Sequence, residues 1–340
     1  MDGVAQGLVA RGLIGLAPVA CFLAVLVLLD SYKLVRLRFV LGTVAAGLAA
    51  SACSYLVADA VLRVAPMEAR TFTRYVAPVT EELLKALVIV ALIRWNRIGF
   101  LVDAAILGFA VGTGFALGET LHYLQVAGGA GIGTWIARGF GTAMMHGGAT
   151  AIFAVMGLAM LERAGRSRVR ALLPGFALAV LLHSAYNHFF VSPFASALAI
   201  AIVLPVLLNA VFARSEAAVG AWLGKGFDAD TEMLELIESG RLGDSPVGRY
   251  LHELKAKFHG PMVADLLCYV RLHTELALRA KGILMLRENG FEAPVDEATR
   301  EKFAELGYLE KSIGRTGRLA IQPMLHMSHK DLWQLYMLGK

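Results

Sequence analysis

Long apolar runs joined by short links constrain the fold of this chain more than any other feature of its sequence. A membrane-crossing helix needs about 20 mostly apolar residues, and runs of this kind follow one another up to residue 213. Hydrophobic residues make up 57% of the 340 residues, whereas a soluble domain contains about 45–50%. The sequence therefore predicts an all-α, polytopic membrane helix bundle with about seven spans. The predicted spans are roughly 12–29, 39–62, 75–93, 100–124, 135–161, 170–190 and 194–213.

The composition of the chain changes after residue 213. Charged residues there recur at helical spacing, and Gly-Pro and Asn-Gly pairs separate the helical segments. The stretch 261–288 has the pattern of one long amphipathic helix. We therefore expect two domains: a transmembrane domain at 1–213, and a helical soluble domain at 214–340 in which no catalytic motif is recognised.

Positive charge in the links predicts the orientation, because short cytoplasmic links are enriched in Lys and Arg. The first, third and fifth links are basic and the fourth and sixth are uncharged, while the second, which is also basic, is the exception. This pattern predicts a multi-pass protein of the cell membrane, with its N-terminus outside and its C-terminal domain in the cytoplasm. The net charge of +5 thus belongs to links between spans, and no nucleic-acid partner is expected. The basic residues of the three links are Lys33, Arg36, Arg38, Arg94, Arg97, Arg163, Arg166, Arg168 and Arg170.

Three charged residues open the third span. Glu81 and Glu82 are followed by Lys85 and then by an unbroken apolar run. Each charge in hydrocarbon costs about 2.5–3.5 kcal/mol on insertion scales. On a helix, both carboxylates are within reach of the ammonium group. The trio is either a self-neutralising helix start, with Thr80 as N-cap, or part of a catalytic or ion-handling site.

Polar residues in three other spans favour the second interpretation. Glu119 follows Phe115 by four residues, His146 lies in the fifth span, and His183 precedes Asn187 by four residues in the sixth. At about 1.5 Å per residue, Glu81, Glu119 and His183 lie roughly 8–10 Å from the outer ends of their spans, and His146 about 16 Å. Because these spans alternate in direction, their common depth predicts one pocket in the outer half of the membrane.

Other polar and small residues in the spans are expected to have different roles. Asp59 lies near the outer end of the second span and could join the pocket, whereas Asp103 lies at the inner end of the fourth span and is expected to cap it. The fourth span also contains small-xxx-small pairs, which allow close helix packing. These pairs are Gly108 with Gly112 and Gly114 with Gly118.

Glutamates and histidines in a dry pocket are suited to hydrolysis of a peptide bond. One carboxylate would act as general base on water. In one scheme Glu119, His146 and His183 hold a metal such as zinc, with one position open for water. In another, the histidines and Asn187 stabilise the oxyanion without a metal. The His-Glu-x-x-His signature of zincins and the Gly-x-Ser-x-Gly motif are both absent.

Four short motifs in order resemble those of the PrsW family of intramembrane proteases. More distantly, they resemble membrane proteases that process CaaX proteins and bacteriocins. The likeness implies a polytopic enzyme that cleaves a membrane-anchored protein, such as an anti-sigma factor, on its outward side. It implies catalytic roles for Glu81 and Glu82, while the residues from the other spans complete the site. The motifs are Glu81-Glu82-Leu-Leu-Lys85, Phe115-Ala-Leu-Gly-Glu119, His146, and His183 with Asn187, within roughly residues 75–190.

Two alternatives come from other functional classes. Intramembrane Glu and His also mark ion pathways, so a proton- or ion-coupled transporter is one of them. The chain shows no inverted repeat, which disfavours it. A non-catalytic membrane sensor is the other, and it requires that the pocket residues be replaceable. The sequence predicts neither the substrate nor the oligomeric state.

Overall fold

The computed structural model describes residues 2–164, 169–255, 258–291, 293–322 and 325. Every regular element in these residues is a helix, which confirms the all-α prediction. The chain forms two compact units, one made of Met1–Asp30 with Leu34–Glu216 and the other of Ser31–Lys33 with Ala217–Lys340. A single helix, α9 (Pro193–Glu238), runs without a break through the predicted domain boundary at residue 213.

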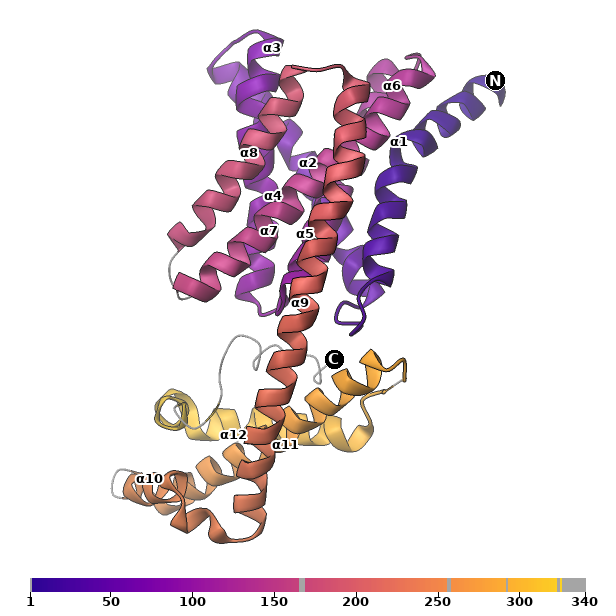
Figure 1. The fold of residues 1–340 in the computed structure, drawn as a ribbon. Helices are drawn as coiled ribbons and strands as arrows, with labels where there is room; N and C mark the ends of the chain where they lie inside the picture. Colours follow the sequence, from indigo (N-terminus) through magenta and orange to yellow (C-terminus); the bar gives the residue numbers. More distant parts are fainter. Residues whose placement is uncertain (1, 165–168, 256–257, 292, 323–324, 326–340) are drawn as a thin grey trace. The chain divides into compact units, whose positions relative to one another are not determined.

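Six helical stretches in the described residues are long and apolar enough to cross a membrane. They correspond to six of the predicted spans and confirm a membrane helix bundle (Figure 1). Two of the stretches include short π or 3₁₀ turns in addition to α-helix. The stretches are α1 (Asp2–Leu28), α2 (Leu37–Val64), α5 (Leu101–Ala127), α6 (Ile132–Ala137) with η2 (Arg138–Ala143) and α7 (Met144–Ala164), η3 (Val169–Leu172) with α8 (Leu173–His188), and α9.

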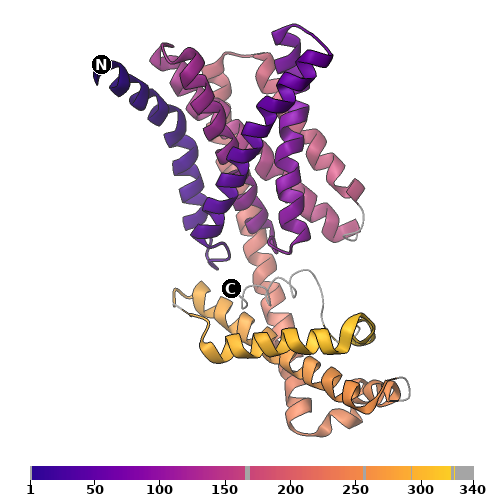
Figure 2. The same ribbon diagram turned by 180° about the vertical axis from the view of Figure 1, so that it is seen from behind.

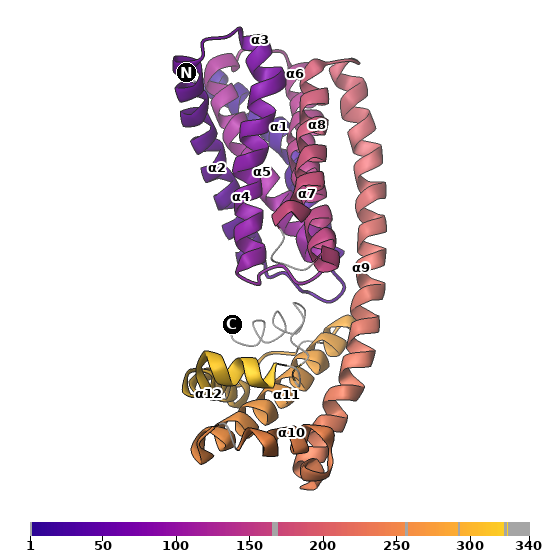
Figure 3. The same cartoon turned by 90° about the vertical axis from the view of Figure 1, so that its left-hand side faces the viewer.

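The remaining predicted span is α4 (Ala77–Arg94), which carries too many charges to be counted with the six. It packs between α2 and α8, and Figure 3 shows it alongside the other helices of the unit. The helix does not begin at Glu81, the start that Thr80 as an N-cap would give. It continues directly from α3 (Ala69–Thr71) and the π-helical η1 (Phe72–Val76). Thr80 consequently lies inside the helix, where its hydroxyl donates to the carbonyls of Val76 and Ala77 instead of capping.

Helix α5 is the centre of the first unit, since it is buried over most of its length and packs against α7 on one side and α2 on the other. The predicted glycine pairs explain this close packing. A Cβ on Gly112 would lie 2.2 Å from the carbonyl oxygen of His146 in α7, and one on Gly114 would lie 1.9 Å from the carbonyl oxygen of Val44 in α2. Both contacts require glycine, and the first fixes the height of His146 against α5.

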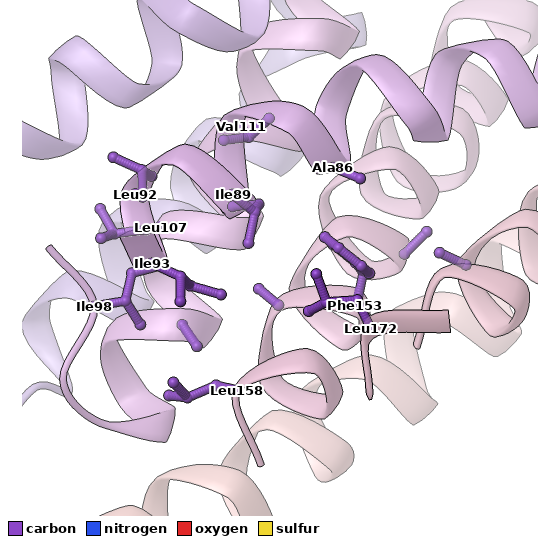
Figure 4. Packing of buried hydrophobic residues seen from close by; sticks show 14 of the residues in the cluster. Ala86, Ile89, Leu92, Ile93, Ile98, Leu107, Val111, Phe153, Leu158 and Leu172 are labelled. Carbon is purple, nitrogen blue, oxygen red and sulfur yellow. The ribbon is translucent and has the colours of Figure 1, made fainter. Parts of the chain in front are cut away.

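The apolar core of this unit includes the part of α4 that follows its charged residues. Ile89, Leu107 and Leu158, from α4, α5 and α7, are fully buried there (Figure 4). In the same unit, α3 and α6 lie at one end and the α4–α5 turn at the other. Asp103 caps α5 at that turn as predicted, because its carboxylate accepts from the backbone of Gly99 and Phe100.

The second unit is a separate helical assembly. It contains the C-terminal part of α9, η4 (Arg241–Asp244), α10 (Pro246–Leu254), α11 (Gly260–Glu288) and α12 (Glu297–Ile321), seen from behind in Figure 2. Helix α11 confirms the single long helix predicted at 261–288. A buried ion pair of 2.5 Å joins Lys281 of α11 to Asp230 of α9. The unit therefore has its own packing.

Candidate active site

Lys85 is the buried centre of a polar cluster in the first unit. Its side chain has no solvent exposure, and its ammonium lies 4.7 Å from the centre of the Phe115 ring. The Nζ atom is 2.5 Å from Glu82 Oε1 and 3.0 Å from His146 Nδ1. Glu82, only 2% exposed, therefore neutralises the lysine. The ion pair lowers the free-energy cost of burying these two charges, which is high for an unpaired charge in a membrane.

The same glutamate orients a histidine from another helix. Oε1 of Glu82 lies 2.8 Å from Nδ1 of His183 in α8. A carboxylate accepts hydrogen bonds, so Nδ1 carries the proton and Nε2 keeps a free lone pair. That nitrogen faces Glu81, whose Oε2 is 3.8 Å away and whose side chain is 22% exposed. The two adjacent glutamates thus differ: Glu82 is buried and contacts Lys85 and His183, whereas Glu81 is partly exposed.

His146 of α7 is held at both ring nitrogens. An ammonium has no lone pair, so Nδ1 accepts from Lys85 and the ring proton is on Nε2. That proton is donated to Glu119 Oε2 at 2.8 Å. The rings of His146 and His183 meet edge to face at 4.8 Å between their centres. The structure therefore brings together six of the seven predicted site residues, all but Asn187.

Asn187 makes a different contact from the one expected. Its amide donates to the carbonyl of Thr73 in η1, at 2.8 Å, and is exposed. The hydroxyl of Ser184 donates to the carbonyl of Arg74 in the same segment. These bonds fasten the end of α8 to the segment that leads into α4. Asp59 is also apart from the cluster, because it forms an exposed ion pair with Arg63.

One residue of the cluster was not among the predicted ones. Arg138 of η2 places Nη2 3.3 Å from Oε1 of Glu119, and its guanidinium lies 4.1 Å from the centre of the Tyr123 ring. In the sequence it lies near the end of a predicted span, beside an aromatic residue. Such arginines commonly reach to the membrane surface, so the pattern alone does not distinguish it.

The comparisons with known proteins agree with this geometry. A family model described as PrsW family intramembrane metalloprotease matches residues 31–213. The chain belongs to the PrsW family. Neither the curated proteins nor the solved structures contain a match to it. As a PrsW protein the chain is an intramembrane peptide hydrolase, and the resemblance carried by the four motifs is confirmed.

A PrsW protein described as a metalloprotease should present a set of metal ligands. Glu81, His146 and His183 offer ligand atoms that all lie within 4.8 Å of one another. The predicted set differed, with Glu119 in the place of Glu81. His183 fits a metal well, because its Nδ1–H is held by a carboxylate while Nε2 is free, as in many metal-binding histidines. His146 fits once one of its nitrogens releases its present partner, Lys85 or Glu119.

An apolar cavity of about 390 Å³ lies beside the PrsW site, between α7, α8 and α9. Met145 and Leu182, which immediately precede the two site histidines, belong to its wall, and Tyr186 and Ser196 are its only hydroxyl-bearing residues. The cavity is therefore large enough to take apolar side chains.

Proposed function

We propose that this protein hydrolyses a peptide bond in a membrane-anchored protein and that Glu81 acts on the attacking water. The observation that supports the proposal is the convergence of three carboxylates, two imidazoles and one ammonium group from four helices, inside a largely apolar bundle. Such a cluster is costly unless it is used. Its members are Glu81, Glu82, Lys85, Glu119, His146 and His183.

Glu81 is the carboxylate best placed to receive a proton. Among the described residues, no lysine or arginine lies within 4 Å of it, whereas Glu82 pairs with Lys85 and Glu119 with Arg138. It is also partly open, so water can reach it. A general base must be free to take the proton and close to the reacting water, and Glu81 meets both requirements.

In the reaction, Glu81 acts as the base for one water molecule. As the water oxygen bonds to the carbonyl carbon, one of its protons passes to Glu81. The C–N bond breaks, and the proton on Glu81 passes to the leaving amine, which restores the carboxylate. His183, held by Glu82 with Nε2 open, lies opposite Glu81 and can contact the reacting oxygen. Lys85 keeps Glu82 ionised as the acceptor for His183.

When a metal is bound, Glu81, His146 and His183 would hold it, Glu81 through one carboxylate oxygen, which leaves the second oxygen available to the proton of the water. Two imidazoles and a carboxylate are a ligand set that zinc accepts. When bound, the metal would supply Lewis acidity to the attacking water or to the peptide carbonyl. Glu82 and Glu119 would then orient the two histidines, as carboxylates commonly do for ligand histidines.

We place the site in the outer half of the membrane. Glu81 and Glu82 lie near the start of α4, which follows α3 and η1, and Glu119 lies towards the end of α5, which precedes α6. The α4–α5 turn, with Arg94 and Arg97 in its link, is at the opposite end. Because basic links stay in the cytoplasm, the substrate is cut near the outer end of its membrane segment. The apolar cavity would take side chains next to the cleaved bond. A regulator such as an anti-sigma factor is a substrate of this kind.

Co-expression with a library of single-span membrane proteins tests the function. Each library member carries a different epitope tag at each end. Fragments are expected with the wild type and not with the Glu81→Gln/Glu82→Gln double variant, and their lengths should place the cut near the outer end of the span. Cuts near the cytoplasmic end would contradict the placement of the site. Equal fragments from the double variant would exclude the proposed mechanism, and ion-flux assays would then test the transporter alternative.

Removal of metal is expected to abolish this cleavage. Purified protein is treated with a chelator and then dialysed, and cleavage of an identified substrate is measured before and after addition of Zn²⁺. Loss and recovery are expected because the three ligand residues cannot themselves supply the positive charge with which the metal would activate the water. Full activity after verified metal removal would leave Glu81 as a metal-free base, with the histidines at the oxyanion.

A further inference from the structure

We propose that Arg138 is a positioning residue of the site, which holds Glu119 so that Glu119 fixes the ring of His146. The inference rests on the proposed function and assigns a role to a residue outside the four sequence motifs. The guanidinium group of Arg138 is partly buried beside Glu119, and each of the two histidines is held by a carboxylate.

The side chain of Arg138 is 14% exposed and has few alternatives to its present position. Its Nη2 lies 3.3 Å from Glu119 Oε1, and its guanidinium covers the Tyr123 ring. Glu119 and Tyr123 are four residues apart on α5, so both contacts are made on one face of that helix. The planar guanidinium can bind a carboxylate and stack on an aromatic ring at once, which a lysine cannot reproduce.

The two oxygens of Glu119 have separate partners. Oε1 faces Arg138, and Oε2 accepts from Nε2 of His146 at 2.8 Å. A contact to the first oxygen therefore limits rotation of the carboxylate and keeps the second oxygen towards the imidazole. Glu119 is itself 31% exposed, and without Arg138 its carboxylate would be free to turn to water.

The other histidine is also held through a carboxylate and a cation, although both contacts there are made to one oxygen, Oε1 of Glu82. Lys85 binds Glu82, and Glu82 accepts from Nδ1 of His183. The site thus contains two units, each made of a cation, a carboxylate and a histidine. The lysine of one unit also contacts His146, which joins the two units. Arg138 completes the second unit in the way that Lys85 completes the first.

The π-helical turn of η2 explains how Arg138 reaches this position. Arg138 and His146 are eight residues apart, which would separate their directions by about 80° on a regular α-helix. A π turn takes up one extra residue, so the two side chains point within about 20° of each other. Both can then contact Glu119 from the same side.

The test compares Arg138→Met and Arg138→Lys with Arg63→Met, which removes the cation of an exposed ion pair. With an identified substrate, Arg138→Met is expected to lower kcat about 10-fold, the lower end of the cost of removing a direct partner of a ligand histidine, because Arg138 acts through Glu119. KM should change little, because Arg138 does not contact substrate. Arg138→Lys should recover part of the loss, and Arg63→Met should match the wild type.

A double-variant comparison separates positioning from a general structural role. If Arg138 acts through Glu119, adding Arg138→Met to Glu119→Gln should cause no further loss of kcat. Thermal unfolding of the solubilised protein is measured in parallel. Independent losses in the two backgrounds, an effect on KM alone, or a loss that only follows the folded fraction would each overturn the proposal.

A readout without cleavage keeps this inference distinct from the proposed function. In protein with isotope-labelled histidine, the ring-nitrogen signal of His146 is assigned by its absence in His146→Gln. It should report a proton on Nε2 and should shift in Arg138→Met but not in Arg63→Met. An unchanged signal would overturn the inference even if cleavage is established. Absence of cleavage by the wild type would instead count against the proposed function.

Discussion

Replacing Lys85 with methionine is expected to abolish cleavage and to destabilise the membrane unit by about 3–5 kcal/mol. The lysine is fully buried, and its ammonium contacts both Glu82 and His146. Methionine keeps most of the volume but leaves the Glu82 carboxylate charged and without a cation. His146 also loses the donor that fixes its proton on Nε2. Activity against an identified substrate and thermal unfolding of the solubilised protein are the two measurements.

Two further variants show which part of this effect is electrostatic. Lys85→Met/Glu82→Gln removes both charges, so it should recover much of the lost stability while remaining inactive. Arg63→Met removes a cation from the exposed pair with Asp59, and such pairs contribute about 0–1 kcal/mol. A Lys85→Met protein as stable as the wild type would show that Glu82 is protonated and that the pair is not ionic.

The bundle and its spans could be predicted because burial in a membrane imposes long apolar runs on the sequence. Helix α4 shows one departure. Its span is predicted at 75–93 despite its charges, but the helix start with Thr80 as N-cap is not found, because the helical turns of η1 already supply the carbonyls that a cap would replace. A capping motif in the sequence does not show whether the residues before it are already helical.

The sequence indicates six residues that lie together in the structure, but not how they pair. Spacing allowed Lys85 to bind either Glu81 or Glu82, and only the position of His183 in a distant helix makes Glu82 its partner. Asn187 shares a helical face with His183, yet it lies about 6 Å further along the axis. At that height it meets the backbone of Thr73 instead of the other site residues.

Glycine spacing predicted close packing of α5 but not its partners. The same small-xxx-small pattern fits any neighbouring helix, and only the structure shows that Gly112 faces His146 and Gly114 faces Val44. Arg138 was missed for a related reason. A π turn changes the direction of the residues that follow it, and the sequence around η2 contains no feature that predicts one.

Glu81→Gln is expected to lower kcat by about 10²–10⁴-fold, the usual contribution of a general base, with little change in stability. Its side chain is partly exposed and has no cation partner within 4 Å among the described residues. Glutamine keeps its size and hydrogen-bonding oxygen but cannot take the proton from water. Glu82→Gln should also be inactive, because His183 loses the carboxylate that orients it.

Stability distinguishes the two glutamates. In Glu82→Gln the ammonium of Lys85 remains buried without its counter-ion, at a cost of about 3–5 kcal/mol, so thermal unfolding should occur well below that of Glu81→Gln. Equal stability of the two variants would mean that the lysine can use either carboxylate, as the spacing alone allows. A Glu81→Gln protein that retains activity while Glu82→Gln does not would transfer the role of base to Glu82. The open carboxylate would then serve to admit water or to hold the metal.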